Sequence, residues 1–313
     1  MNSLVTVAFY NLENLFDTKD NPNTLDRDFL PWGKKFWTEK KYQKKVRKMG
    51  KAISNIAKDK TGKSPVLVGL AEVENATVIS DLVDSKHLKA SNYNFVHYDS
   101  PDERGIDVAL LVNEDYFKVE YSETIPISIY EMDGVKDYTR DALYVQGYLS
   151  GEEVHVFVCH WPSRRDGADA TGHKRVQASE QLSAFIEANE GINQTSKIII
   201  MGDFNDNPVD ESVKDYLVTD MLYNPFEKLM TITRGSLSYY NNWHLFDQVI
   251  FSHNFFKIEK GKHSFQNANI FDAPFLTEWE GRSKGNPFRT YSGKRYLGGY
   301  SDHFPVYINL KKT

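Results

Sequence analysis

The chain contains a single cysteine, Cys159, and this scarcity excludes several kinds of site. One cysteine can form neither a disulfide framework within the chain nor a cysteine-rich zinc site. Cys159 ends the mostly apolar run 154–159. We therefore interpret it as a small buried hydrophobe rather than a nucleophile.

Long apolar runs are missing as well. No stretch reaches the roughly 20 apolar residues that a membrane-spanning helix needs. The chain enters a predicted strand at Leu4 without the basic and apolar regions of a signal peptide. We expect a soluble protein, cytoplasmic if the chain is complete and exported if a leader has been removed.

Positive charge is not in excess, because the formal net charge is -5. A protein that coats nucleic acid by charge alone is therefore not expected, although local basic patches around a site remain open. No serine lies in a nucleophile elbow, and no glycine-rich phosphate-binding loop is present.

The 313 residues are 40% hydrophobic and 13% aromatic, which favours a sheet-rich protein with a substantial core. We find no internal repeat, linker or break in composition. We therefore expect one domain over residues 1–313 and a monomer, and no partner protein is indicated.

Apolar, β-branched runs predict more strands than helices. Helices are expected at 37–57 and 175–190, a long polar loop at 161–174, and irregular structure at 261–300. Strands are expected at residues 4–10, 65–73, 93–98, 106–112, 142–149, 154–159, 197–200, 245–252 and 304–308. The hairpin predicted at 150–153 argues against a doubly wound parallel sheet. It favours mixed, mostly antiparallel sheets packed face to face, with helices outside.

The expected helix at 37–57 is amphipathic and carries many lysines beside its apolar stripe. These lysines fit either a patch for nucleic acid or acidic lipid, or an ordinary solvated helix face. We prefer the solvated face.

Polar side chains recur at the ends of the predicted strands. The set is Asn11, Glu72, His160, Asp203 with Asn205, and Asp302 with His303, while Asp247 lies within a further strand. Such groups can converge on one rim of a sandwich, where the core behind each strand holds them rigidly. Oxygen ligands without a thiol indicate a hard cation, Mg²⁺ or Mn²⁺.

These motifs resemble, in order, those of the endonuclease/exonuclease/phosphatase family, the DNase I-like metal-dependent phosphodiesterases and phosphatases. Gly-Asp-Phe-Asn at 202–205 and Ser-Asp-His-Phe-Pro-Val at 301–306 carry the resemblance most specifically. It extends over nearly the whole chain, through residues 9–14, 70–75, 104–107, 160–164 and 246–247. The resemblance implies an α/β (α+β) fold, a four-layer α/β/β/α sandwich.

The resemblance also implies roles at particular residues. Glu72 resembles the principal metal ligand, with Asn11 close to the ion and Asp302 on the metal side. Asp203 resembles the group that orients or deprotonates the attacking water, and Asn205 resembles a contact to a phosphate oxygen or the metal. The resemblance further implies that His160 and His303 contact the phosphate and that Asp247 orients His303.

Some residues near these motifs are interpreted from the sequence alone. Asp107, at the edge of an apolar strand, is either the carboxylate partner of His160 or a strand-end acid facing solvent. A ligand role for Glu13 is doubtful, and Asp206 is interpreted as a turn residue. Gly202 is expected to permit close backbone approach.

Arginines are candidates for gripping phosphate oxygens, namely Arg140, Arg164, Arg165 and Arg175. For Arg175, a bond that ties its loop to its helix is preferred. Residues 279–300 interleave basic and aromatic side chains. This pattern fits stacking on bases and an ordered loop packing its own aromatics equally well.

We consider three functions for this chain, in order of preference. The first is hydrolysis of phosphodiesters in DNA or RNA. The second is the same chemistry on a smaller target, such as a nucleotide, a phosphoinositide or a phospholipid head group. The third is a binding module on this fold without catalysis.

Overall fold

The computed structural model describes residues 4–240 and 242–313, and these residues form two six-stranded mixed sheets. The order of the first sheet is β15 (His263–Ile270), β18 (Val306–Lys312), β1 (Leu4–Leu15), β2 (Leu67–Val73), β4 (Asp107–Asn113), β3 (Tyr93–His97). The order of the second is β11 (Leu222–Tyr223), β14 (Asp247–Ser252), β10 (Ile198–Asp203), β9 (Glu152–His160), β8 (Ala142–Leu149), β5 (Phe117–Ile125).

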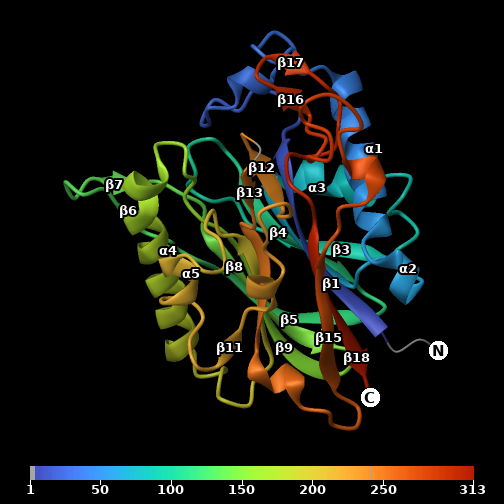
Figure 1. Cartoon of the computed structure of the whole chain (residues 1–313), viewed down its shortest axis with the longest axis vertical. Helices are drawn as coiled ribbons and strands as arrows, with labels where there is room; N and C mark the ends of the chain where they lie inside the picture. Colours follow the sequence, from blue (N-terminus) through green and yellow to red (C-terminus); the bar gives the residue numbers. More distant parts are fainter. Residues whose placement is uncertain (1–3, 241) are drawn as a thin grey trace.

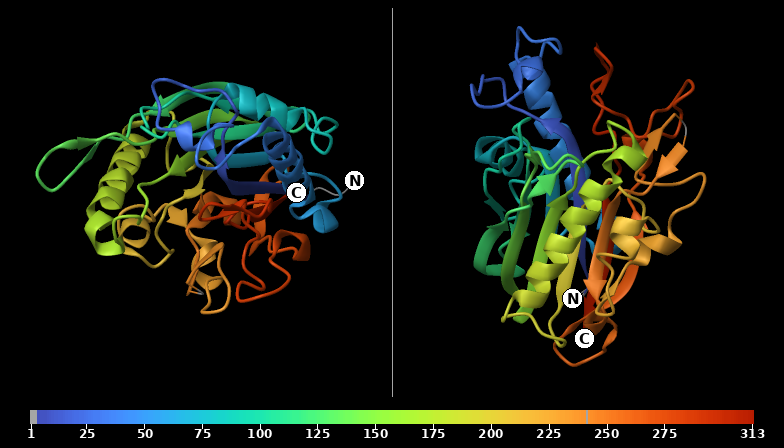
Figure 2. Two further views of the ribbon diagram at one scale, coloured as in Figure 1. Left: turned by 90° about the horizontal axis from the view of Figure 1, so that it is seen from above. Right: turned by 90° about the vertical axis from the view of Figure 1, so that its left-hand side faces the viewer.

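Helices cover the outer faces of both sheets, which completes four layers (Figures 1 and 2). The first sheet is flanked by α1 (Glu39–Asn55), α2 (Lys58–Thr61) and α3 (Ala76–Val83), and the second by α4 (Ala168–Ala188) and α5 (Glu211–Lys214). The predicted four-layer sandwich is therefore confirmed. Within the described residues, none of these helices combines the length and apolar character that crossing a bilayer requires.

Shorter elements lie in the connections. Three separate two-stranded sheets, as counted over the described chain, are formed by β6 (Ile129–Tyr130) with β7 (Lys136–Asp137), β12 (Leu237–Tyr239) with β13 (Asn242–His244), and β16 (Tyr291–Ser292) with β17 (Arg295–Tyr296). Single 3₁₀ turns occupy η1 (Arg27–Phe29), η2 (Pro225–Lys228), η3 (His253–Phe256) and η4 (Pro274–Leu276).

Strand β10 is apolar at successive positions because both of its faces are buried. Ile199 and Met201 belong to the core between the sheets, whereas Ile198 and Ile200 belong to the core beneath α4. The sheets meet closely here, because a Cβ added at Gly69 of β2 would lie 2.5 Å from the Met201 sulfur. A strand covered on both sides in this way needs an apolar residue at every position.

Strand direction gathers the polar strand ends at one edge of the sandwich. Strands β1 and β2 are parallel, as are β9 and β10, so each pair ends at the same edge. Strands β14 and β18 run antiparallel to β10 and β1, so each begins where its partner ends. Residues from distant parts of the sequence therefore meet at this edge.

Several predicted boundaries were wrong. Strand β1 continues to Leu15, and α4 begins at Ala168 within the stretch predicted to be a loop. The stretch 261–300, predicted to be irregular, contains β15 and the β16–β17 hairpin. Strand β15 is polar at many positions because it is an edge strand, paired only with β18, so it lacks a strong apolar signal.

The lysines of α1 do not form a solvated face, contrary to the preferred interpretation. Lys41 lies 4.6 Å from the ring centroid of Tyr296, Lys48 lies 4.5 Å from that of Tyr300, and Lys51 lies 4.7 Å from that of Phe275. These cation–π contacts attach α1 to the segment 275–300. Most aromatics of this segment therefore pack inside the protein, as expected of an ordered loop.

A buried ionic cluster joins the two sheets at the edge opposite the polar strand ends. Glu152 of β9 lies 2.9 Å from Lys197 Nζ and 2.8 Å from Nδ1 of His263 in β15. It also accepts a 2.7 Å hydrogen bond from the His263 backbone N–H. Burial alone would raise the pKa of Glu152, but these bonds lower it from 4.5 to about 2.

Replacing Glu152 should therefore destabilise the protein in a pH-dependent way. Glu152→Gln leaves Lys197 buried without its counter-charge, so we expect the free energy of unfolding at pH 7 to fall by about 3 kcal/mol. Because the folded pKa is lowered, this stabilisation is present above about pH 4.5 and is lost as pH falls toward 2. Urea unfolding at several pH values measures the difference. The exposed Glu153→Gln is the matched control, and an equal loss in both variants would contradict the cluster's role.

Candidate active site

Three functional side chains lie in one row across the second sheet. Asp203, at the end of β10, is in register with His160 of β9 and with Asp247 of β14. The strand register thus places an acid between a histidine and a second acid. All three side chains are buried.

Asp203 Oδ2 is the point on which three nitrogen atoms converge. Asn11 of the other sheet donates a 2.9 Å hydrogen bond from Nδ2 to this oxygen. His160 Nε2 lies 3.7 Å from it and His303 Nε2 lies 4.0 Å from it. Burial, and then the charge of Asp247, raise the pKa of Asp203 to about 6.

The two histidines differ in charge because their surroundings differ. Burial alone would lower the pKa of His303, but Asp247, 2.6 Å from its Nδ1, and the other acids raise it well above its usual value. Burial and then the charges of Arg140 and Arg104 lower the pKa of His160 well below its usual value. The surroundings therefore favour the cationic form of His303 and the neutral form of His160.

Glu72 reaches this edge from a β-bulge in β2. The register of β2 against β4 shifts between Ala71 and Val73, and Glu72 between them has a left-handed φ of 60°. Glu72 Oε2 accepts a 2.8 Å bond from the Asn14 N–H, and its Oε1 lies 3.8 Å from Arg104. A bulge re-aims a side chain, and a left-handed non-glycine residue stores strain of about 1 kcal/mol or more.

Asp302 is held beside His303 by Arg289, which donates to it at 2.6 Å. Its Oδ1 lies 4.0 Å from His303 Nε2. Burial alone would raise the pKa of Asp302, but His303 and Arg289 lower it. The carboxylate is therefore ionised.

Beneath this edge, Lys45 of α1 is fully buried, a role that the sequence did not reveal. Its Nζ donates to Thr290 Oγ1 at 2.6 Å and lies 3.8 Å from Glu13. Glu13 in turn accepts a 2.5 Å bond from the Thr290 N–H. Lys45 is one of many lysines on α1, and only its place on the apolar stripe, between Tyr42 and Met49, distinguished it in the sequence.

The Gly-Asp-Phe-Asn stretch shows why each of its residues is needed. A Cβ at Gly202 would lie 2.5 Å from the Cys159 carbonyl, so the close approach predicted at Gly202 is present. Phe204 is buried and packs edge-on against Trp161 at 4.7 Å. Asn205 has a left-handed φ of 50° and donates from Nδ2 to the Trp161 carbonyl at 2.9 Å.

Comparison with known proteins identifies the family of this chain. The profile of the Endonuclease/Exonuclease/phosphatase family matches residues 6–312. The chain belongs to this family. Family members are phosphoesterase hydrolases. No curated protein sequence matches the chain.

Solved structures share the fold over nearly the whole chain. A family protein from Bacteroides thetaiotaomicron has 16% identity and a TM-score of 0.61, with 99% of this chain and 98% of that chain covered. D. rerio TDP2 complexed with single strand DNA product has 15% identity and a TM-score of 0.58, with 99% and 100% covered. A mannosyl-6-phosphatase from Bacteroides thetaiotaomicron has 16% identity and a TM-score of 0.56, with 98% and 99% covered. At these identities the likeness establishes the fold alone.

The expected phosphate-gripping arginines have mostly structural contacts in this family member. Arg140 donates to the carbonyls of His160 and Trp161, at 3.2 and 2.7 Å, and to Asp102 at 2.9 Å. Arg164 donates to the Asn205 carbonyl at 2.6 Å and also binds Asp206 and Asp210. Both residues therefore help to hold the loop, and their contact with phosphate stays a prediction.

Arg175 and Asp206 form a buried pair, which agrees with the preferred interpretation of Arg175 and corrects that of Asp206. Arg175 Nε lies 2.7 Å from Asp206 Oδ2, and the same guanidinium donates to Thr171 Oγ1 at 2.7 Å. Arg175 therefore ties the loop to its helix, and Asp206 is its counter-ion rather than a turn residue alone. Arg165 is exposed, and its contact with substrate stays a prediction.

Asp107 does not pair with His160, so that proposal was wrong. Its Oδ2 lies 3.2 Å from His97 Nε2, and its Oδ1 accepts bonds from Ser100 Oγ at 2.5 Å and the Ser100 N–H at 3.0 Å. Strand β3 lies next to β4, so His97 is the nearer histidine. Among the described residues, His160 Nδ1 has no hydrogen-bond partner.

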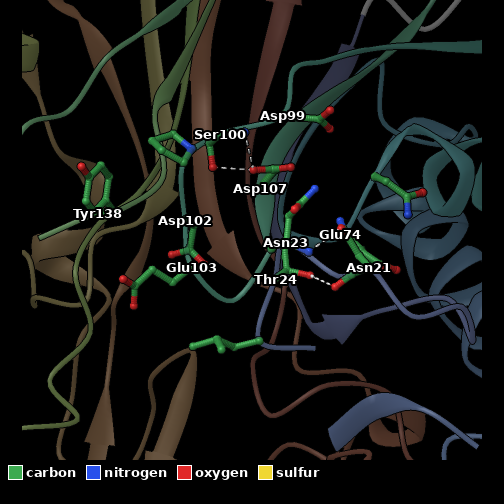
Figure 3. Close-up of a pocket in the computed structure, with 14 residues that line it drawn as sticks. Asn21, Asn23, Thr24, Glu74, Asp99, Ser100, Asp102, Glu103, Asp107 and Tyr138 are labelled. Atoms are coloured by element: carbon green, nitrogen blue, oxygen red, sulfur yellow. Dashed lines mark hydrogen bonds between the residues drawn. The ribbon is translucent and has the colours of Figure 1, made fainter. Parts of the chain in front are cut away.

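Asp107 instead lines a cavity of about 690 Å³ beside the active site (Figure 3). The lining includes Glu74, whose Oε2 accepts a 2.6 Å bond from the Asp17 N–H, and Asn75, which caps α3. Glu74 and Asn75 thus stabilise the chain around Glu72. The residues that line this cavity do not include Asp203 or either active-site histidine.

The donor set at this edge fits a hard divalent cation. Glu72, Asn11 and Asp302 offer carboxylate and amide oxygens, which Mg²⁺ and Mn²⁺ prefer. Burial and then the charge of Asp302 raise the pKa of Glu13 to about 7, so acidic groups repel each other here. Among the described residues, the acidic and histidine atoms that lie close enough to share one ion include Asp203, Asp247 and His303, but neither Glu72 nor Asp302.

Substitution should distinguish Arg175, which has a structural role, from the exposed Arg165 by their effects on the free energy of unfolding. We expect Arg175→Gln to lower the free energy of unfolding by about 3 kcal/mol, because it leaves Asp206 buried with less counter-charge. The neighbouring control Arg165→Gln should change stability by less than about 0.5 kcal/mol. Urea unfolding at pH 7 measures both. Equal stabilities would show that the Arg175–Asp206 pair contributes nothing.

Proposed function

We propose that this protein is a metal-dependent phosphodiesterase that hydrolyses nucleic acid by in-line attack of water. The convergence of Asn11, His160 and His303 on Asp203 Oδ2 is the observation that carries the proposal. A buried acid surrounded by hydrogen-bonding nitrogens suits a reaction that moves a proton from water beside a phosphate.

In this mechanism, Asp203 orients the attacking water and accepts its proton. Asn11 donates to Asp203 Oδ2, and the Asn205 N–H donates to Asp203 Oδ1 at 3.0 Å. These two bonds hold the carboxylate in one orientation. The water oxygen then forms a bond to phosphorus while the bond to the leaving oxygen breaks.

The phosphate is bound and its developing charge is stabilised by the histidines. His303 carries a positive charge and is oriented by Asp247, so its Nε2–H can donate to a phosphate oxygen. His160, neutral and buried, adds a second imidazole on the other side of Asp203. Asn205 keeps its amide oxygen for substrate or metal because its Nδ2 binds Trp161.

Glu72, Asn11 and Asp302 would hold the divalent cation, Mg²⁺ or Mn²⁺. When bound, such a cation offsets the negative charge of the phosphate and of the leaving oxygen. The hydrogen bond from the Asn14 N–H and the nearby Arg104 orient the Glu72 carboxylate for this role.

Nucleic acid is preferred as substrate, with one specific alternative. D. rerio TDP2, which shares the fold, has been solved with a single strand DNA product. A mannosyl-6-phosphatase also shares the fold, which favours a small phosphate ester as the second candidate. The net charge of -5 disfavours tight binding of duplex DNA.

Loss of either central group should abolish most activity. We expect Asp203→Asn to lower kcat on bis-p-nitrophenyl phosphate at least about a hundredfold, because the proton acceptor is lost. His303→Ala should cause a similar loss, because a positive donor to the phosphate is removed.

The matched controls are Asp215→Asn and His253→Ala, which change exposed residues. Both should keep kcat within about twofold of the unchanged chain, since exposed positions outside the site contribute little. Circular dichroism and urea unfolding verify that each variant is folded. Near-normal turnover in Asp203→Asn or His303→Ala would reject the mechanism.

A substrate panel with Mg²⁺ tests the substrate class. We expect cleavage of single-stranded oligonucleotides, weakening as salt rises, and slower hydrolysis of nucleotides, inositol phosphates and mannose 6-phosphate. EDTA should abolish all of these activities, and added Mg²⁺ or Mn²⁺ should restore them. A preference for mannose 6-phosphate would favour the small-ester alternative, and activity that survives EDTA would exclude the metal.

A further inference from the structure

A second cavity, of about 550 Å³, opens directly from the catalytic edge. One wall is the β12–β13 hairpin and the other is the segment 278–297, while Asp302 lies in its lining. The side chains that matter here are Ser238, Tyr239, Tyr240, Arg282, Arg289 and Asp302. Through Asp302, the cavity lies beside His303.

Strand β12 connects this cavity to His303 through the backbone. Leu237 of β12 forms an isolated β-bridge with His303, and the Phe304 N–H donates to the Ser236 carbonyl at 2.6 Å. From Leu237 the strand leads outward to Tyr239 and the hairpin turn (Figure 1). A substrate whose phosphate contacts His303 would thus extend along β12 toward the tyrosines.

The cavity lining contains polar atoms without partners. Ser238 Oγ and Arg289 Nε are buried, and neither has a hydrogen-bond partner among the described residues. The nearest ion-pair acceptor of Arg289 Nε is Glu13, at 3.9 Å. The Arg289 guanidinium also donates to Asp302, so these groups give this part of the cavity a polar wall.

The hairpin turn presents aromatic rings that the protein does not cover. Tyr240 is 83% exposed and Tyr239 is 63% exposed. Their rings lie 4.5 Å apart at 72°, so Tyr239 supports Tyr240 in an edge-to-face contact. The aromatics of the segment 288–300 differ, because the α1 lysines cover them.

The charges of the lining are balanced. The lining contains two arginines, Arg282 and Arg289, and two acids, Glu278 and Asp302, so it has no large excess of positive charge. A duplex backbone needs many phosphate contacts. An unpaired nucleotide needs a ring to stack on and few cations. This combination favours the unpaired nucleotide.

We propose that this cavity binds the unpaired nucleotide next to the scissile phosphate, with its base stacked on Tyr240 and the following phosphate near Arg282. The proposal rests on the proposed function, because it places the reacting phosphate between Asp203 and His303. It restricts the substrate to single-stranded nucleic acid or to unpaired ends.

The test compares substrates with and without a base at this position. We expect Tyr240→Ala to raise KM for a single-stranded oligonucleotide at least about fivefold, with kcat nearly unchanged, because one base loses its stacking partner. Hydrolysis of bis-p-nitrophenyl phosphate, which has no base, should not change. Tyr240→Phe should keep the KM of the unchanged chain, since the ring remains.

Tyr130→Ala is the matched control. Tyr130 is an exposed tyrosine on the β6–β7 hairpin, which packs against α4. The KM of the Tyr130→Ala variant for the oligonucleotide should stay within about twofold of that of the unchanged chain, because Tyr130 is a surface residue outside the site. An oligonucleotide with an abasic residue beside the scissile phosphate should raise KM for the unchanged chain as much as Tyr240→Ala does.

Binding measured without turnover separates this proposal from the proposed function. In an Asp203→Asn background, Tyr240→Ala should raise the Kd of the same oligonucleotide at least about fivefold. If binding depends on Tyr240 in this way but the unchanged chain does not cleave the oligonucleotide, the nuclease assignment fails and the binding site stands. An unchanged Kd, equal KM values in Tyr240→Ala and the unchanged chain, or full activity on the abasic substrate would overturn the proposal.

Discussion

The hydrogen bond from Asn11 to Asp203 is the interaction on which the active site depends, because it joins the two sheets at the catalytic edge. Asn11 belongs to the first sheet and Asp203 to the second. The close contact between Gly69 and Met201 brings the sheets near enough for side chains this short to meet. At the opposite edge, Glu152 and His263 join the sheets again through a 2.8 Å contact. The sandwich is thus held at both ends, and the catalytic groups have little freedom to move apart.

Neighbouring charge decides what each titratable group at this edge can do. His303 and His160 both lie near the same oxygen of Asp203, yet one is charged and the other neutral. Asp247 touches His303, whereas arginines surround His160. In the proposed mechanism, this difference lets His303 bind the phosphate while Asp203 accepts the proton of the water. The same residue types in other surroundings would not divide these roles.

Many basic side chains hold the segments around the site, which explains why most of them are not expected to contact substrate. Lys45 and the other α1 lysines attach the segment 275–300, and this attachment holds Arg289 against Asp302. Arg140 and Arg175 hold the loop that follows His160. With these cations committed to the scaffold, the lining of the cavity beside Asp302 keeps balanced charge and exposed tyrosines. We infer that base stacking, more than charge, selects the substrate.

The sequence alone determined the sandwich class and the buried strands, and it predicted which residues form the candidate catalytic edge. These features are local: β10 is apolar at successive positions because both its faces are covered, and Asp203 follows directly where the strand ends. Pairing across the chain was not determined, because two or more partners were chemically equivalent in the sequence. Asp107 could have paired with either histidine, and only the adjacency of β3 and β4 selected His97. Asp206 was interpreted as a turn residue, and only the folded loop brought it within 2.7 Å of Arg175. Tertiary structure decided these roles because ion pairs and hydrogen bonds depend on distances between residues far apart in the chain.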